Sequence, residues 1–277
     1  MAVEISVIIP TCGSNNFIYE TFLSLENQML SHNSFEIIVV ANGVSDFFLE
    51  ELNFFFLRSK IINYKIISTI TLGVSNARNL GIENSIGDYI CFVDDDDIIS
   101  SDYLSGLYNA IGENSIVISN VKCFLTDLTI LSDDYLSLAF NIRKDEINFK
   151  GLKIRKFLSS SCCKLIKKSV ISDTRFINSI KLNEDSLFMF QISKNIKSLK
   201  CSEDNAIYYR RLRPNSASRQ KINIFYIIND FLTFSYLLSK IYFKSPFKYN
   251  FSIYLGHLIA NLNTTLKKVL TNFNLIK

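Results

Sequence analysis

The chain of 277 residues predicts an α/β protein, in which a mostly parallel sheet is flanked by helices and followed by a helical C-terminal extension. Three observations lead to this prediction. Short apolar runs without polar alternation recur in residues 1–120, as in strands buried on both faces of a parallel sheet. Each run is followed by apolar residues at helical spacing, which gives the βαβ pattern. Residues 222–270 show helical periodicity alone.

The first 120 residues contain the clearest elements. We expect strands at residues 5–10, 35–40, 64–67, 89–93 and 115–119. We expect helices over residues 18–29, 45–60, 73–84 and 104–111. Asn15 or Asn16 is the candidate N-cap of the first helix, because a short polar side chain can accept from the free N–H groups there.

Residues 121–220 are less regular. After a loop at 127–134, a strand or loop over 146–161 leads into a short helix near 164–170. Asn183 is a candidate N-cap for a helix that begins with Glu184 and Asp185. A short aromatic strand at 206–211 and a loop at 214–218 precede two or three amphipathic helices.

The composition of the chain restricts the class of protein that the sequence can encode. The six cysteines include no Cys-x-x-Cys pair, so we expect neither a disulfide framework nor a zinc site. The N-terminal apolar run lacks basic residues before it, so we interpret it as a strand rather than a signal peptide. No uncharged apolar run of about 18 residues indicates a transmembrane helix.

The charge distribution is uneven. Residues 1–150 carry 8 basic and 20 acidic side chains, whereas residues 151–277 carry 22 and 6. An acidic half beside a basic half suits a metal-nucleotide site next to a face for anionic phosphate or lipid. A chance cluster of solvated lysines is the alternative interpretation.

Four consecutive acids, Asp94 to Asp97, follow the apolar run at 89–93. Adjacent carboxylates repel one another unless a cation lies between them, and carboxylate oxygens suit Mg²⁺ or Mn²⁺. A solvated turn or an acidic first turn of a helix is the alternative. The acids stand at the carboxyl end of a buried strand, where open α/β sheets bind ligands. Thr11 and Asn42 follow two other predicted strands and should meet the acids there.

Several further motifs complete a recognisable pattern. They are ISVIIPT at 5–11, the strand at 36–40, GVSNARN at 73–79, GDYI at 87–90, FVDDDD at 92–97, KLIKKS at 164–169 and Glu184–Asp185. In this order and spacing they resemble the inverting family-two glycosyltransferases, whose GT-A fold is Rossmann-like. The resemblance covers residues 3–220 and implies a nucleotide-binding half (1–120) and an acceptor half (121–220) of one catalytic domain.

The resemblance implies donor-binding roles for five residues outside the acidic run. Pro10 and Thr11 lie beside the nucleotide base or ribose, and Asn42 hydrogen-bonds a base edge. Arg78 faces the uracil and the diphosphate, which its fixed fork of donors suits. Lys164 neutralises the diphosphate, with a plain surface lysine as the equal alternative.

It also implies the metal and catalytic residues. Asp94 and Asp96 form a D-x-D motif that binds Mn²⁺ or Mg²⁺ on the diphosphate, and Asp95 lies between them in the donor site. Asp97 is a supporting residue or a helix N-cap. Asp185 is the base that takes the proton from the acceptor hydroxyl, and one displacement with one base inverts the anomeric centre.

One position departs from the family. An acidic residue usually ends the second strand, where this sequence has Ala41 followed by Asn42 and Gly43. The sequence therefore leaves open whether the nucleotide base is uracil or another base.

The resulting prediction is a metal-dependent inverting hexosyltransferase. It uses UDP-glucose or UDP-galactose and a lipid-diphosphate-linked saccharide, in bacterial O-antigen or capsule synthesis. A UDP-N-acetylhexosamine transferase, a nucleotidyltransferase and an inactive nucleotide-sugar-binding scaffold are the alternatives. We expect no nucleic acid partner and a cytoplasmic protein.

The C-terminal extension, residues 221–277, has two interpretations. Its aromatic residues pack on the catalytic domain, or else they contact the inner membrane from its cytoplasmic face. The second interpretation rests on Phe243, Phe247, Phe251 and Tyr254, which alternate with lysines.

Overall fold

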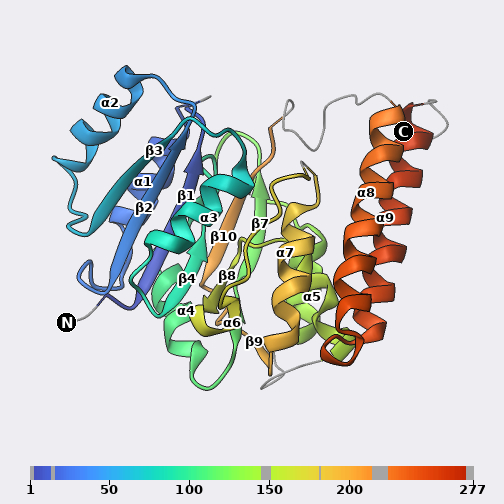
Figure 1. Cartoon of the computed structure of the whole chain (residues 1–277). Coiled ribbons are helices and arrows are strands. Elements are labelled where there is room, and N and C mark those ends of the chain that lie inside the picture. Colours follow the sequence, from blue (N-terminus) through green and yellow to red (C-terminus); the bar gives the residue numbers. More distant parts are fainter. Residues whose placement is uncertain (1–2, 14–15, 145–150, 181, 214–223, 273–277) are drawn as a thin grey trace.

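The computed structural model describes residues 3–13, 16–144, 151–180, 182–213 and 224–272. Its centre is a seven-stranded sheet of order β3-β2-β1-β4-β8-β6-β9, flanked by helices, beside a smaller sheet of order β5-β10-β7 (Figure 1). The strands are β1 (Ile5–Thr11), β2 (Phe35–Asn42), β3 (Tyr64–Thr69), β4 (Tyr89–Phe92), β5 (Ile98–Ile99), β6 (Ile116–Ile118), β7 (Asn120–Phe124), β8 (Lys164–Lys167), β9 (Leu199–Cys201) and β10 (Ile207–Arg211). The predicted α/β class is confirmed.

Helical segments alternate with the strands in the first part of the chain and, among the described residues near its C-terminus, continue without strands. They are α1 (Ile18–Glu26), α2 (Asp46–Phe56), α3 (Val74–Asn84), α4 (Tyr103–Ile111), α5 (Tyr135–Arg143), the 3₁₀ segment η1 (Gly151–Ser159), α6 (Lys168–Ile171), α7 (Glu184–Ile192), η2 (Ser193–Asn195), α8 (Ile224–Lys244), η3 (Pro246–Lys248) and α9 (Phe251–Asn272). β1 pairs in parallel with β2 and β4, so their carboxyl ends meet at one edge of the sheet.

The helix expected near residues 164–170 is mostly a strand. β8 lies antiparallel between β4 and β6, and only residues 168–171 are helical. Leu165 and Ile166 are fully buried there. A two-residue apolar pair between lysines is too short for periodicity to distinguish a helix from a strand.

The structure also adds elements that the sequence did not predict. β5, β7 and β9 are short, and α5 begins within the segment interpreted as irregular. Asp134 caps α5 by accepting from the N–H groups of Leu136 and Ser137, while Ser137 bonds back to Asp134. This capping box fixes the start of the helix.

Of the two predicted N-caps, the one of α1 differs from the structure and the one of α7 stands at the predicted position. Phe17 occupies the N-cap position of α1 without a side-chain bond, and Asn15 lies outside the described residues. Asn183 does stand at the N-cap of α7, but in the left-handed conformation, and its amide donates to Asp230 instead. The loop expected at 214–218 also lies outside the described residues.

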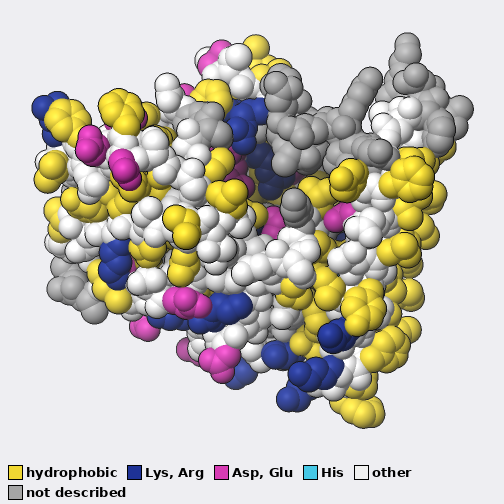
Figure 2. Space-filling view, turned by 45° about the horizontal axis from the view of Figure 1, so that its top comes forward, with side chains coloured by type: hydrophobic (Ala, Val, Ile, Leu, Met, Phe, Trp, Pro, Cys, Tyr) yellow, Lys and Arg dark blue, Asp and Glu magenta, His cyan; other side chains and the backbone are white. Residues whose placement is uncertain are grey.

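The C-terminal helices α8 and α9 lie side by side along one flank of the molecule (Figure 1). Phe234 and Leu238 of α8 are buried, and α8 packs on α7 while α9 packs on η1. α8 contains Asp230, Lys240 and Lys244 and so is not an uncharged apolar run, but by length and composition alone it is long and apolar enough to cross a membrane. Figure 2 shows hydrophobic side chains along the outer side of these helices.

Candidate active site

The ends of three strands meet through direct hydrogen bonds. Thr11, which ends β1 after Pro10, donates from its hydroxyl to Asp95 Oδ2 over 2.6 Å. Asn42 at the end of β2 donates to the carbonyl of Thr11 over 3.0 Å and accepts from the N–H of Gly73 over 3.2 Å. The amide of Asn42 therefore ties two strands to the start of α3, and its contact with a nucleotide base stays a prediction.

Arg78 joins the two acidic motifs. Its guanidinium donates to Asp94 Oδ1 over 2.9 Å and to Asp185 Oδ1 over 2.7 Å, and Glu184 lies 3.5 Å away. Burial alone would lower the pKa of Arg78, but Asp185 and Asp94 raise it well above its ordinary value. Helix α3 thus places one permanent cation between carboxylates that are far apart in the sequence. Contact of Arg78 with uracil or diphosphate stays a prediction.

The four consecutive acids have different environments. Asp94 is the most open, with 41% of its side chain exposed. Asp95 holds Thr11, and Asp96 pairs with Arg213 Nε at 2.5 Å. Asp97 is buried and accepts from the N–H of Arg211 over 2.7 Å. Desolvation raises the pKa of Asp96 to about 6, helped by Asp94, and desolvation also raises the pKa of Asp95 and of Asp97.

An arginine-rich strand end faces these acids. The hollow between them has a volume of about 470 Å³ and is lined by Asp94, Asp96, Arg210 and Arg213, among others. Arg210 pairs with Asp134 over 2.6 Å, so the α5 cap also orients this strand. Arg210, Arg211 and Arg213 all line the hollow, and arginines suit the oxygens of a diphosphate.

The carboxylates of Asp94 and Asp96 fit a divalent cation of the type implied by the resemblance. Within the described ranges, no group of three or more His, Cys, Asp or Glu could hold a metal alone. Mg²⁺ and Mn²⁺ at nucleotide sites, however, are held by one or two carboxylates together with phosphate oxygens. Both acids line the diphosphate-sized hollow, and repulsion by Asp94 helps raise the pKa of Asp96, which a cation would relieve.

Asp185 lies in the first turn of α7 with one oxygen engaged. Oδ1 accepts from Arg78 and from the hydroxyl of Ser161, which lies 2.9 Å away. No hydrogen bond to Oδ2 is found in the described part of the chain, which leaves that atom available to take a proton. Neighbouring Glu184 is mostly buried, and desolvation together with Asp185 raises its pKa to about 7.

Lys164 has a different environment from the one expected. Its side chain is buried, and Nζ donates to the carbonyls of Ser160 and Cys162. These bonds hold the turn that presents Ser161 to Asp185, in which Cys163 adopts a positive φ of 65°. Contact of Lys164 with the donor stays a prediction. The sequence offered no signal for Ser161, because a lone serine in an irregular segment matches no motif.

The comparisons with known proteins agree with this arrangement. The model of glycosyl transferase family 2 matches residues 6–175, and the chain belongs to this family. It is 26% identical over 207 residues to the poly(ribitol-phosphate) beta-N-acetylglucosaminyltransferase TarP of Staphylococcus aureus, covering 74% of this chain and 62% of TarP. It is 30% identical over 210 residues to the poly(ribitol-phosphate) beta-glucosyltransferase of Bacillus spizizenii, covering 74% of this chain and 32% of that enzyme. The chain thus spans less than two thirds of either relative.

Solved structures share the fold. A fragment of S. aureus TarS in complex with UDP-GlcNAc superposes with a TM-score of 0.70 at 21% identity, over 87% of this chain and 67% of that one. The mannosyltransferase PcManGT of Pyrobaculum calidifontis, in complex with GDP-Man and Mn²⁺, gives 0.64 at 13% identity, over 100% and 77%. The fold is therefore GT-A, as expected from the sequence.

Proposed function

We propose that the protein is a metal-dependent inverting glycosyltransferase that uses a nucleotide-diphosphate sugar. The observation that carries this proposal is the pair of bonds from Arg78 to Asp94 and Asp185. They bring Asp94, one of the two carboxylates proposed for the donor, and Asp185, the base proposed for the acceptor, to the two terminal nitrogens of one guanidinium. A scaffold without activity would not need this juxtaposition.

Different residues of the chain have different roles in the proposed reaction. Asp94 and Asp96 hold a divalent cation that, when bound, stabilises the leaving diphosphate. The arginines at the end of β10 add positive charge on the other side of that hollow. Asp185 removes the proton of the acceptor hydroxyl through Oδ2, while Arg78 and Ser161 fix its orientation through Oδ1. Attack from the face opposite the diphosphate gives a β-glycoside from an α-linked donor.

The proposal extends to the chemical class of the donor and of the acceptor. The donor is UDP-glucose or UDP-galactose, with UDP-N-acetylhexosamine as the second candidate, since relatives are named for both glucosyl and N-acetylglucosaminyl transfer. The acceptor hydroxyl belongs to a sugar or polyol joined to phosphate. It is a lipid-diphosphate-linked saccharide or a poly(polyol phosphate) chain like the polymer in the relatives' names. The setting is cytoplasmic surface-polymer synthesis at the inner membrane.

A thermal-shift panel tests the donor part. UDP, GDP, CMP and dTDP are each added with and without Mn²⁺, and the melting temperature is measured. One nucleoside diphosphate should raise the melting temperature only when the metal is present, because a ligand that binds the folded state stabilises it. No response to any pair would count against the proposal.

A further inference from the structure

A second hollow lies beside the start of α7, the helix that carries Asp185. Its volume is about 320 Å³, and its lining includes Asn183 and Ser186, which flank Glu184 and Asp185 in the sequence. Tyr135 lines both this hollow and the one that holds the acids. The opposite wall is α9, through His257 and Asn261. We call this space the α9 hollow.

Two buried polar atoms of the α9 hollow lack partners. His257 is 3% exposed and Asn261 is 8% exposed, and neither His257 Nε2 nor Asn261 Nδ2 has a hydrogen bond in the described structure. Burial, together with nearby Arg155, lowers the pKa of His257 to about 3, so the imidazole is neutral. Buried polar groups are normally paired, and an unpaired one costs about 1–3 kcal/mol. Hydroxyl groups of a ligand would satisfy both atoms.

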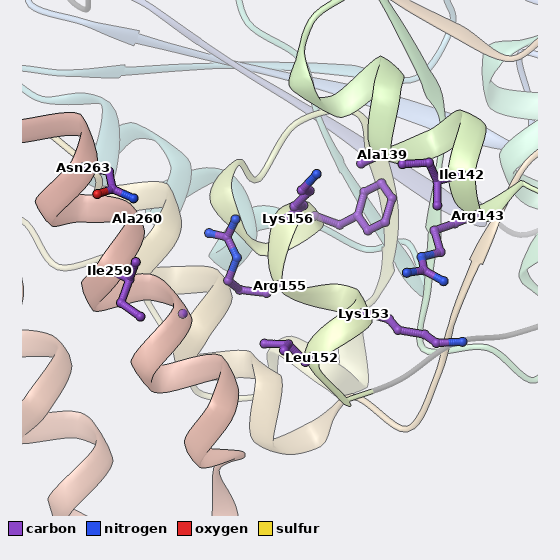
Figure 3. Close-up of a pocket in the computed structure, with 12 residues that line it drawn as sticks. Ala139, Ile142, Arg143, Leu152, Lys153, Arg155, Lys156, Ile259, Ala260 and Asn263 are labelled. Atoms are coloured by element: carbon purple, nitrogen blue, oxygen red, sulfur yellow. The ribbon is translucent and has the colours of Figure 1, made fainter. Parts of the chain in front are cut away.

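A basic groove continues from the α9 hollow between α5, η1 and α9. The groove measures about 390 Å³, and Arg155 and Ala260 line both spaces. Figure 3 shows Arg155 and Lys156 of η1 between the helix that carries Ala260 and the helix that carries Ala139, Ile142 and Arg143. Together with Lys153, these basic side chains line the groove, and no described lining residue is acidic.

Arg155 is held in place by its packing against α9. A Cβ at Gly256 would lie 2.6 Å from Arg155 Cδ, so the glycine allows this close approach. Burial lowers the pKa of Arg155, and no ion pair of its side chain occurs in the part of the chain that the structure describes. A partly desolvated cation without an anionic partner is suited to an anionic ligand.

We propose that the α9 hollow and the basic groove form the acceptor site, in which His257 and Asn261 meet hydroxyls next to the reacting one and Arg155 and Lys156 bind the adjoining phosphate ester. This inference rests on the proposed glycosyl transfer. It makes the C-terminal helix α9 a wall of the acceptor site. Ribitol-phosphate and lipid-diphosphate acceptors share the phosphate ester, so the experiment includes both.

Binding and turnover are measured separately on the full chain. A ribitol-phosphate oligomer and farnesyl-diphosphate-linked N-acetylglucosamine are titrated calorimetrically without donor. The double variant Arg155→Gln/Lys156→Gln should weaken binding of whichever probe the wild type binds by on the order of tenfold. It should raise the acceptor KM and leave the donor KM unchanged. Lys267→Gln, which removes an exposed charge from α9 outside the groove, is the matched control and should change neither value.

Two further variants address folding and the hydroxyl contacts. Gly256→Ala should displace Arg155 and weaken probe binding, although alanine favours the helix by about 1 kcal/mol, so lost stability would not explain the loss. Asn261→Leu should raise the acceptor KM alone. An unchanged KM in Asn261→Leu would overturn the hydroxyl contacts.

The results separate this site from the proposed function. Equal probe affinity of the double variant and the wild type would overturn the acceptor site, as would a wild type that binds neither probe. Probe binding that depends on Arg155 and Lys156, with no transfer from any sugar nucleotide, would support the site and contradict the proposed function instead.

Discussion

The bonds to Asp185 allow its chemical role to be separated from its structural one. Asp185→Asn keeps an oxygen that accepts from Arg78 and Ser161, but it removes the proton acceptor. We expect turnover to fall by about 10²–10⁴-fold, while the stabilisation by UDP and Mn²⁺ remains. Asp96→Ala should instead abolish the metal-dependent stabilisation. Normal turnover of Asp185→Asn would show that another group is the base.

Glu184 makes the stability of the ligand-free protein depend on pH. Its pKa is about 7 in the folded protein, raised from 4.5, so the folded state binds more protons than the unfolded state between these values. Stability from this group is therefore present at low pH and is lost as the pH rises from about 4.5 to about 7. Glu184→Gln should raise the melting temperature at pH 8 and flatten its fall from pH 5 to pH 8. An identical slope in the variant would contradict this assignment.

At the scale of elements, the close packing of α3 on β1 positions Arg78. A Cβ at Gly81 would lie 2.3 Å from Ile8 Cγ2, so the glycine sets the distance between helix and strand. Gly81→Ala should destabilise the protein by about 1–3 kcal/mol through overpacking, although alanine is the better helix former. Chemical denaturation measures the change. In an Ile8→Ala background most of that cost should disappear; additive effects of the two substitutions would argue against the contact.

The sequence predicts elements best where one pattern is long and regular. β1, β2 and α3 lie where apolar runs and helical spacing indicated them, because each of them carries a long, regular pattern of buried residues. β8 owes its place to distant partners, since it fits between β4 and β6. β10 was predicted as a strand, but its pairing with β5 and β7 also depends on distant partners. No local pattern carries that information.

The residues of the site also divide into those that sequence motifs predict and those that only the folded structure reveals. The residues of the acidic run and Asp185 could be named from motifs. The bond from Ser161, the carbonyls that hold Lys164, and the position of α9 across one hollow from Asn183 and Ser186 arise only from the folded chain. Residues that act through loop geometry or tertiary packing leave no periodicity in the sequence.

At the scale of the whole molecule, the C-terminal helices have two sides with different roles. Their inner side packs on α7 and η1 and lines the α9 hollow. Their outer side exposes large apolar residues, among them Phe243 at 67%, Phe247 at 104% and Phe251 at 56%, near the turn between the helices. Deleting the extension would therefore remove the inner wall together with the outer surface, so membrane contact is better tested by point substitutions.

We expect the triple variant Phe243→Ser/Phe247→Ser/Phe251→Ser to lose binding to vesicles rich in phosphatidylglycerol in a flotation assay. Burial of each phenylalanine in the interface contributes about 1.5–3 kcal/mol, and the lysines beside them add about 1 kcal/mol each at an anionic surface. High salt should weaken the binding of the wild type, because it screens the attraction between the lysines and the anionic lipids. The matched control replaces three exposed apolar residues of or next to α2, namely Phe47, Phe54 and Leu57, by serine. If the triple variant and this control float equally well, the outer side of α8 and α9 does not contact the membrane, and its apolar residues need another partner.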